Sequence, residues 1–277
     1  MTEFLEADGG RIAYDVTGDG PLVVLSHGMG DTRTAFRFLA PKLVAAGYRV
    51  ATADLRGLGE SSTGFAAYTR TETAKDLLAL IRHLGGPAVI VGHSYSGGSA
   101  TIAAALEPES VSAIVELDSF TRAQKIDLGG LIRNGYHRKG IRLLFSAGIF
   151  GSLGLWEKYL DHAYPAVKPA DWDQQLAAMR DNLGQPARMK VLQAMGRSAP
   201  TDAGALLSQV RCPALITAGT LDPDWNDPKS EVDGIVAAMP AGTATAAMFE
   251  GAGHYPHVQY PDRVAEVLLP FLKQHAA

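Results

Sequence analysis

The stretch that most constrains the fold is Pro87–Ala105, where a β-branched run, a turn rich in glycine and serine, and an alanine-rich segment follow one another directly. The run Val89–Val91 is short and apolar, which predicts a buried strand, and the alanine-rich residues after Gly98 favour a helix. Only a very tight turn fits between these two elements. A serine at such a turn is exposed at the end of the strand, with the first N–H groups of the helix pointing toward whatever it contacts.

The turn residues 92–96, GHSYS, resemble the Gly-x-Ser-x-Gly nucleophile elbow of the α/β-hydrolase family. The sequence departs from this pattern at Ser96, where glycine is usual. A second register would make Ser96 the nucleophile. That residue would already lie in the first helical turn, past the bend, so strand register favours Ser94.

Composition indicates a globular chain with a large core. A length of 277 residues is enough for one sizeable α/β domain with an insertion. Of these residues, 47% are hydrophobic and 19% are charged, which suits a globular protein. The formal net charge of −4 and the pI of about 6.1 give no electrostatic reason to bind nucleic acid or an anionic membrane. We therefore expect a small-molecule partner, and the composition leaves open whether the chain is a monomer or a homodimer.

Three sequence features favour a cytoplasmic protein. The single cysteine, Cys212, rules out an internal disulfide and fits a reducing compartment. The N-terminal residues carry no basic or long apolar region, so no signal peptide is expected. The uncharged segment Leu143–Trp156 has 14 residues, including three glycines, and is shorter than the ~20 residues that a membrane span needs.

Strands and helices alternate along most of the chain. This spacing predicts a doubly wound, mostly parallel, eight-stranded α/β sheet. Asp31 or Thr32 is expected to cap a helix that runs to Ala46, and the capping box at Thr69 and Glu72 is expected to open another. The strands are expected at 3–7, 11–16, 22–25, 48–53, 89–91, 111–117, 213–217 and 245–249, and later helices at 229–239 and 262–275.

The alternation stops after Asp118 and resumes near residue 213. Residues 119–199 contain helical stretches, glycine breaks and aromatics but no credible strand. We interpret them as an all-helical cap, or lid, inserted after the sixth strand of a core formed by residues 1–118 and 200–277. The cap is expected over the carboxyl edge of the sheet, where ligands bind in open α/β folds.

Two later segments complete the resemblance to α/β-hydrolases. The segment 218–223, AGTLDP, follows a predicted strand, and 251–257, GAGHYPH, follows the last one. Their order after Ser94 is that of the family's nucleophile, acid and histidine. The resemblance implies a catalytic triad of Ser94, Asp222 and His254. Asp118 is an alternative acid, because some members of this fold place the carboxylate after the preceding strand.

Other motifs suggest supporting roles. Residues 27–30, HGMG, resemble the family's oxyanion loop, which implies an oxyanion hole made by the backbone N–H groups of Met29 and Tyr95. Residues 54–61 resemble a structural segment of the family, in which Asp54 and Arg56 order neighbouring loops. The aromatic residues expected in the substrate pocket are Trp156, Tyr159 and Trp225.

The sequence does not support a dinucleotide-binding site or a metal site. Gly28-x-Gly30 and Gly57-x-Gly59 lack the third glycine of a dinucleotide loop, and there is no HExxH motif or cysteine cluster. No cofactor and no metal are therefore expected. Dehalogenases and epoxide hydrolases of this fold carry Asp at the elbow, whereas this chain has serine. The basic stretch Arg133–Arg142 has two interpretations, contact with a carboxylated substrate or a solvated cap face, of which the second is favoured.

The sequence thus predicts a serine hydrolase, a carboxylesterase that cleaves small or medium carboxylic esters through an acyl-enzyme intermediate. Alternatives within the same fold are a cofactor-free haloperoxidase or perhydrolase and a carbon–carbon bond hydrolase. A hydrolase-like ligand receptor with slow turnover is an alternative from another class. Fold alone does not fix the substrate.

Overall fold

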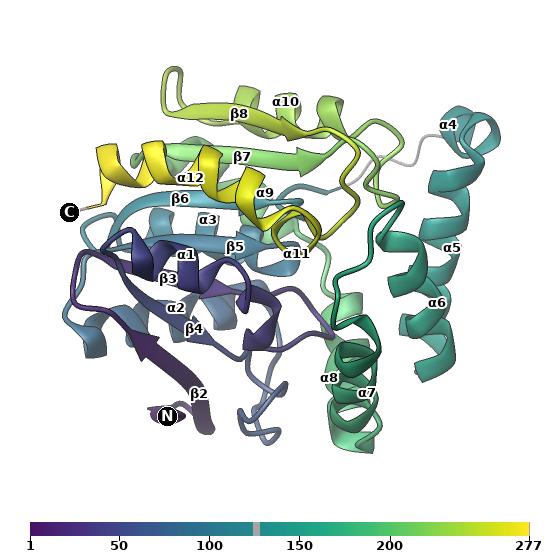
Figure 1. Cartoon of the computed structure of the whole chain (residues 1–277), viewed down its shortest axis with the longest axis horizontal. Helices are drawn as coiled ribbons and strands as arrows, with labels where there is room; N and C mark the ends of the chain where they lie inside the picture. Colours follow the sequence, from purple (N-terminus) through teal and green to yellow (C-terminus); the bar gives the residue numbers. More distant parts are fainter. Residues whose placement is uncertain (124–127, 277) are drawn as a thin grey trace.

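A single sheet with strand order β1-β2-β4-β3-β5-β6-β7-β8 runs through the molecule (Figure 1). The computed structural model describes residues 1–123 and 128–276. Both pairings of β2, with β1 and with β4, are antiparallel, and every other neighbouring pair is parallel. The predicted mostly parallel, eight-stranded sheet is thereby confirmed within these residues. The strands are β1 (Glu3–Ala7), β2 (Gly10–Thr17), β3 (Leu22–Ser26), β4 (Arg49–Ala53), β5 (Ala88–His93), β6 (Val111–Leu117), β7 (Ala214–Gly219) and β8 (Ala244–Phe249).

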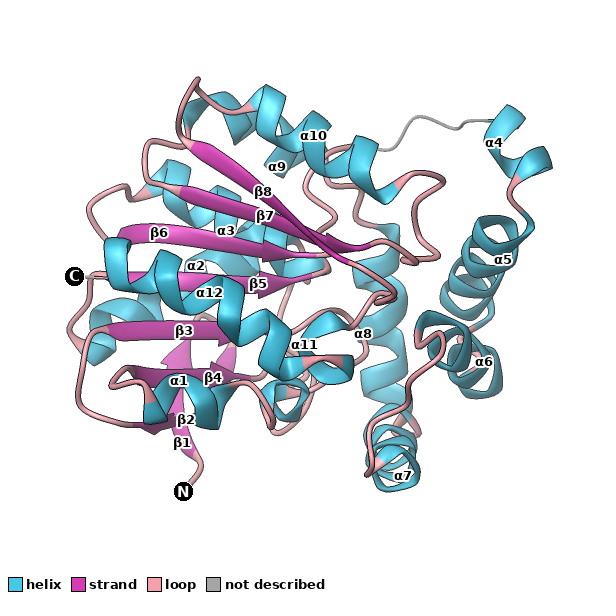
Figure 2. Ribbon diagram, turned by 45° about the horizontal axis from the view of Figure 1, so that its top comes forward, coloured by secondary structure: helices cyan, strands magenta, loops and turns pink. Residues whose placement is uncertain are grey.

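Helices cover both faces of the sheet, as the doubly wound prediction requires. Figure 2 shows α1 (Ala40–Ala45) and α12 (Pro261–His275) in front of it, with α2 (Arg70–Leu84) and α3 (Tyr95–Leu106) behind. Alternate side chains of each strand enter opposite cores. One core joins the sheet to α2, α3 and α10 (Pro228–Ala238), and the other joins it to α1 and α12.

The helix predicted from about residue 31 to Ala46 is wrong in its extent. The chain forms a short 3₁₀ turn, η1 (Arg33–Phe36), and only then the helix α1. Pro41 explains the break, because proline donates no hydrogen bond and its ring clashes with the preceding helical turn. By contrast, the cap predicted for α2 is present, since the Thr69 hydroxyl accepts a hydrogen bond from the Glu72 amide at 3.2 Å.

The described part of the insertion between β6 and β7 consists of helices joined by loops and contains no strand, which confirms an all-helical cap (Figure 1). It lies beyond the carboxyl ends of the parallel strands. A third apolar core, which includes Trp156, Leu192, Tyr95 and Tyr255, joins the cap to the sheet domain. The cap helices are α4 (Leu128–Arg133), α5 (Gly135–Phe150), α6 (Leu153–Ala163), α7 (Trp172–Leu183) and α8 (Pro186–Arg197).

Three short elements complete the described fold. The helix α9 (Thr201–Leu206) and the turn η2 (Leu207–Gln209) follow α8 and pack against α3. The short helix α11 (Pro256–Gln259) comes directly before α12. Across the described helices, no segment combines the length and the apolar character needed to cross a membrane.

Candidate active site

Ser94 occupies a strained bend between β5 and α3. Its φ of 52° and ψ of −113° lie outside the regions that residues with side chains usually adopt. Two glycines make this bend possible. A Cβ on Gly92 would lie 2.3 Å from the Ser96 carbonyl oxygen, and a Cβ on Gly97 would lie 2.2 Å from the Ser119 Cβ. The sequence therefore forces the serine outward at the end of the strand, as the elbow pattern indicates.

A chain of hydrogen bonds joins Ser94, His254 and Asp222. The Ser94 Oγ lies 2.9 Å from His254 Nε2, and His254 Nδ1 lies 2.9 Å from Asp222 Oδ2. All three side chains are buried. Since a carboxylate only accepts, the proton of a neutral imidazole sits on Nδ1 and leaves Nε2 to accept from the serine hydroxyl. This is the arrangement in which an imidazole can take a proton from serine.

A second carboxylate, Asp224, also faces the histidine. Its Oδ2 lies 3.4 Å from His254 Nδ1 and accepts a hydrogen bond of 2.7 Å from the Tyr159 hydroxyl. The Asp224 amide donates to Asp222 Oδ1 at 2.9 Å, which orients the first carboxylate. Sequence reasoning missed Asp224, although it stands only two positions after Asp222 in the same loop.

Asp118 lies beside this pair, at the end of β6. One ligand atom from each of Asp118, Asp222 and His254 falls within 4.8 Å of the others. Burial raises the pKa of the Asp118 carboxyl well above its usual range, and the charge of Asp222 raises it further. Burial alone would lower the pKa of His254, but the charges of Asp222 and Asp224 outweigh it and raise that pKa. The carboxylates thus stabilise an imidazolium.

The same three side chains have the donor types of a metal site, and within the described residues they form the one group so spaced. All but one of their polar atoms have partners inside the protein, and the exception is Asp118 Oδ2, which is buried without a hydrogen-bond partner in the part of the chain that the structure describes. His254 Nδ1 bonds to Asp222, and Asp118 Oδ1 accepts from the Gly219 amide at 2.7 Å. The hydrogen bonds therefore favour proton transfer over metal ligation as the role of this cluster.

The loop after β3 reaches the serine from the opposite side. A Cβ on Gly28 would lie 2.9 Å from the Ser94 Cβ, so the loop backbone runs against the bend. The N–H groups of Met29 and Tyr95 donate no hydrogen bond to the described parts of the chain. Tyr95 is also the first residue of α3, where the helix dipole favours negative charge. Both N–H groups are thus free to receive an oxyanion.

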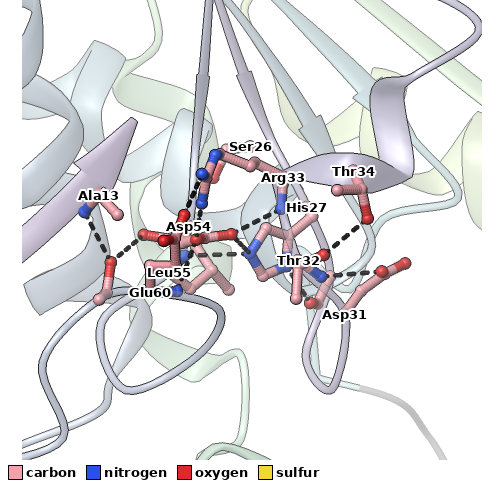
Figure 3. Close-up of polar contacts among 12 residues, drawn as sticks. Ala13, Ser26, His27, Asp31, Thr32, Arg33, Thr34, Asp54, Leu55 and Glu60 are labelled. Atoms are coloured by element: carbon pink, nitrogen blue, oxygen red, sulfur yellow. Dashed lines mark hydrogen bonds and ion pairs between the residues drawn. The ribbon is translucent and has the colours of Figure 1, made fainter. Parts of the chain in front are cut away.

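A polar network holds this loop in place (Figure 3). His27 donates from Nδ1 to the Gly28 carbonyl at 2.7 Å and accepts from the Leu55 amide at Nε2, at 3.0 Å. The Asp54 carboxylate accepts from the Arg33 amide at 2.7 Å and also pairs with the Arg33 guanidinium. His27 therefore braces the loop, and Asp54 orders its neighbours, as the sequence motif suggested.

Two further residues of the motif segments are structural. Arg56 makes two hydrogen bonds of 2.7 Å with Asp76 of α2, which anchors the loop after β4. Ser96, the residue that departs from the elbow pattern, is fully buried and accepts from the Ser26 hydroxyl at 2.9 Å. Its own hydroxyl donates to the His27 carbonyl, so it links α3 to the loop.

Ser94 opens onto a cavity of about 530 Å³ between the sheet domain and the cap. Trp156, Met29 and Tyr95 are among its lining residues, together with side chains of α5 and α8. The other two aromatics expected in the pocket lie outside the lining. These are Tyr159, which bonds to Asp224 behind the histidine, and Trp225, whose ring packs on Phe120 with 5.0 Å between centroids. Both turn away because each fills space around the acidic loop.

The cations that line the cavity are not those of the basic stretch Arg133–Arg142. The basic residues Arg133, Arg138, Lys139 and Arg142 are exposed on the cap and do not line the cavity. Their solvated position agrees with the favoured interpretation of this stretch. Two other arginines do line the cavity, the exposed Arg197 at the end of α8 and the buried Arg70. No sequence signal pointed to Arg70, because in the sequence it is an ordinary residue at the start of a helix.

Comparison with known proteins decides the family. The model of the family described as "Alpha/beta hydrolase family" matches residues 23–267. The chain belongs to the α/β hydrolase family. The cap, the sheet and the elbow found above are the features of this α/β hydrolase.

Sequence identity to individual relatives is modest. The chain is 28% identical over 281 residues to a probable esterase from Oryza sativa subsp. japonica, covering 95% of this chain and 96% of that protein. It is 33% identical over 114 residues to bifunctional epoxide hydrolase 2 from Sus scrofa, but it spans only 20% of that protein's length. An esterase from Exiguobacterium antarcticum superimposes with a TM-score of 0.81 at 20% identity, covering 99% of this chain and 100% of the other. That last likeness shows the fold alone.

Proposed function

We propose that this α/β hydrolase is a serine esterase that cleaves small or medium carboxylic esters through an acyl-enzyme. The observation that carries the proposal is the hydrogen-bonded chain from Ser94 through His254 to Asp222, which ends at the 530 Å³ cavity. The near full-length similarity to a probable esterase supports it. Serine at the elbow, where epoxide hydrolases of this fold carry Asp, favours an acyl-enzyme over an alkyl-enzyme route.

The proposed reaction has two halves, acylation and deacylation, and the same catalytic groups act in both. Ser94 Oγ attacks the ester carbonyl while His254 Nε2 takes its proton, and Asp222 holds and stabilises the imidazolium. The N–H groups of Met29 and Tyr95 bind the oxygen that becomes negative. The imidazolium returns the proton to the leaving alcohol as the carbon–oxygen bond breaks. Water then repeats the attack on the acyl-enzyme and releases the carboxylic acid.

A substrate panel tests this proposal against the other chemistries of the fold. Purified protein is assayed on p-nitrophenyl esters of rising chain length, on lactones, on vinylogous 1,5-diketones and for peracid formation from acetate and peroxide. We expect sustained multiple turnovers on a short ester with kcat on the order of 1 s⁻¹ or faster. Faster carbon–carbon cleavage or peracid formation would replace the esterase proposal, and a single burst followed by stalling on every ester would favour a receptor.

A further inference from the structure

Arg70 is a buried arginine in the wall of the substrate cavity. It is the first residue of α2, it is only 4% exposed, and it lines the cavity together with Ser94. Its guanidinium carbon lies 4.1 Å from the centroid of the Tyr95 ring, which belongs to the residue after the elbow serine. A Cβ on Gly98 would come within 2.8 Å of Arg70 Cδ, so the side chain is packed tightly against α3. The guanidinium is therefore held in one place in the wall of the cavity onto which Ser94 opens.

The charge of Arg70 has no carboxylate in contact with it in the described chain. Its Nη1 donates one hydrogen bond of 2.6 Å to the Ser198 carbonyl, its Nε is buried without a partner, and no described carboxylate lies within 4.0 Å. Asp202 acts on it only from beyond that distance, whereas Arg56, from the loop before the same helix, makes two hydrogen bonds to Asp76. Burial lowers the pKa of the Arg70 guanidinium, yet arginine stays protonated in proteins. A buried cation without a close partner is costly unless something else supplies the opposite charge.

We infer that Arg70 binds a carboxylate of the substrate, so that the preferred esters are half-esters of dicarboxylic acids or esters of carboxylated alcohols. This inference rests on the proposed esterase function and names its substrate class. A guanidinium presents a planar set of donors that matches a carboxylate. One buried guanidinium balances one negative charge, which fits a carboxylate better than a phosphate monoester with nearly two, because the second arginine of the lining, Arg197, is exposed to solvent.

The position of Arg70 also bears on how the substrate is oriented for catalysis. The side chain stacks on Tyr95, whose N–H is a proposed oxyanion donor, so a carboxylate held by Arg70 orients the carbonyl of the same molecule toward Ser94. The rest of the cavity wall is largely apolar, with Trp156 and Leu192 among its residues. The lining holds two arginines, of which Arg197 is exposed and Arg70 is buried, so Arg70 is the preferred partner for a carboxylate held inside the cavity.

Paired esters test the inference on both sides of the scissile bond. Mono-p-nitrophenyl glutarate is compared with p-nitrophenyl pentanoate, and 4-carboxyphenyl pentanoate with phenyl pentanoate. We expect one carboxylated ester to exceed its neutral partner in kcat/KM by about tenfold or more, chiefly through a lower KM. Arg70→Met should reduce that ratio by about tenfold, Arg70→Lys should restore part of it, and Arg82→Met, an exposed arginine of the same helix paired with Glu107, should not change it. Equal kcat/KM values within both pairs would overturn the inference, as would Arg70→Met lowering charged and neutral esters equally.

Binding without turnover separates this inference from the esterase proposal. Glutarate and the neutral glutaramide are titrated into Ser94→Ala protein with Arg70 intact, with melting temperature and calorimetry as readouts. We expect glutarate to bind about tenfold more tightly than glutaramide or better. This measurement also decides the case if Arg70→Met does not fold. Equal affinities would overturn the carboxylate site. Tight glutarate binding to Ser94→Ala, combined with no ester hydrolysis by the parent protein, would support the site and overturn the esterase.

Discussion

Asp224 approaches His254 almost as closely as Asp222 does, with its Oδ2 at 3.4 Å from Nδ1 where that of Asp222 lies at 2.9 Å. The imidazole therefore faces two carboxyl groups on its Nδ1 side. Asp224 is held there by the Tyr159 hydroxyl, and burial, with a further contribution from the charge of Asp222, raises its pKa to about 7. When charged, Asp224 adds to the effect of Asp222 and raises the pKa of His254.

Removing the Asp224 charge should shift the pH dependence of hydrolysis. An anion beside Nδ1 stabilises the imidazolium and raises the pKa of His254, so Asp224→Asn should lower that pKa. Because the neutral imidazole is the active base, the rising limb of kcat/KM should move to lower pH by about one unit. Steady-state pH profiles measure the shift. Asp233→Asn, an exposed carboxylate on α10, is the control and should leave the limb in place. A limb that moves to higher pH would contradict the assignment.

The acid of the triad can be identified by two matched substitutions. Asp222→Asn should leave the imidazole in the wrong tautomer and lower kcat by up to about 10⁴ with little change in fold. Asp118→Asn should keep kcat within about tenfold, since asparagine tolerates the φ of 48° at this position and its amide can still accept from the Gly219 N–H. Steady-state kinetics and circular dichroism of both variants give the ranking. The opposite order would make Asp118 the acid.

Trp156 should set the preference for acyl length. Its indole lies on the cavity wall against Gly30 of the loop after β3, where a Cβ would come within 2.5 Å of the ring. Trp156→Ala should therefore raise kcat/KM for longer acyl chains relative to acetate. Trp225→Ala removes an indole of the same size outside the lining and serves as the control for lost packing. If both variants reduce every ester by the same factor, Trp156 has no role in selection.

Ser96 should matter for stability more than for activity. Ser96→Ala removes the hydrogen bonds to Ser26 and to the His27 carbonyl, at a cost of about 1 to 3 kcal/mol in the free energy of unfolding. Urea denaturation measures this loss, and ester hydrolysis should stay within about tenfold of the parent protein. A stable Ser96→Ala protein without activity would show that the serine at the bend was misassigned.

The elements that were predictable from sequence are those fixed by local chemistry. The β-branched run before Ser94 and the glycines beside it define the elbow, since the bend itself excludes larger residues. The Thr69 cap likewise depends on residues three positions apart. Local patterns failed at Pro41, where a continuous apolar stripe concealed a helix break.

The parts of the site that were not predictable depend on contacts between distant segments. Arg70 begins a helix in the sheet domain, and its one hydrogen-bond partner among the described residues is the carbonyl of Ser198, at the end of the cap helix α8. Asp224 reaches His254 across 30 positions of the chain only because β7 and β8 are neighbours. Trp225 was expected in the pocket for its aromatic character, but packing sets the direction of its side chain.

Covalent labelling identifies the nucleophile, which we assign to Ser94. The protein is incubated with a fluorophosphonate, and intact mass and peptide mapping then locate the adduct. Ser94→Ala and Ser96→Ala proteins are treated in parallel. We expect one adduct per chain on Ser94, its loss together with ester hydrolysis in Ser94→Ala, and its retention in Ser96→Ala. An adduct that persists in Ser94→Ala and disappears in Ser96→Ala would make Ser96 the nucleophile instead.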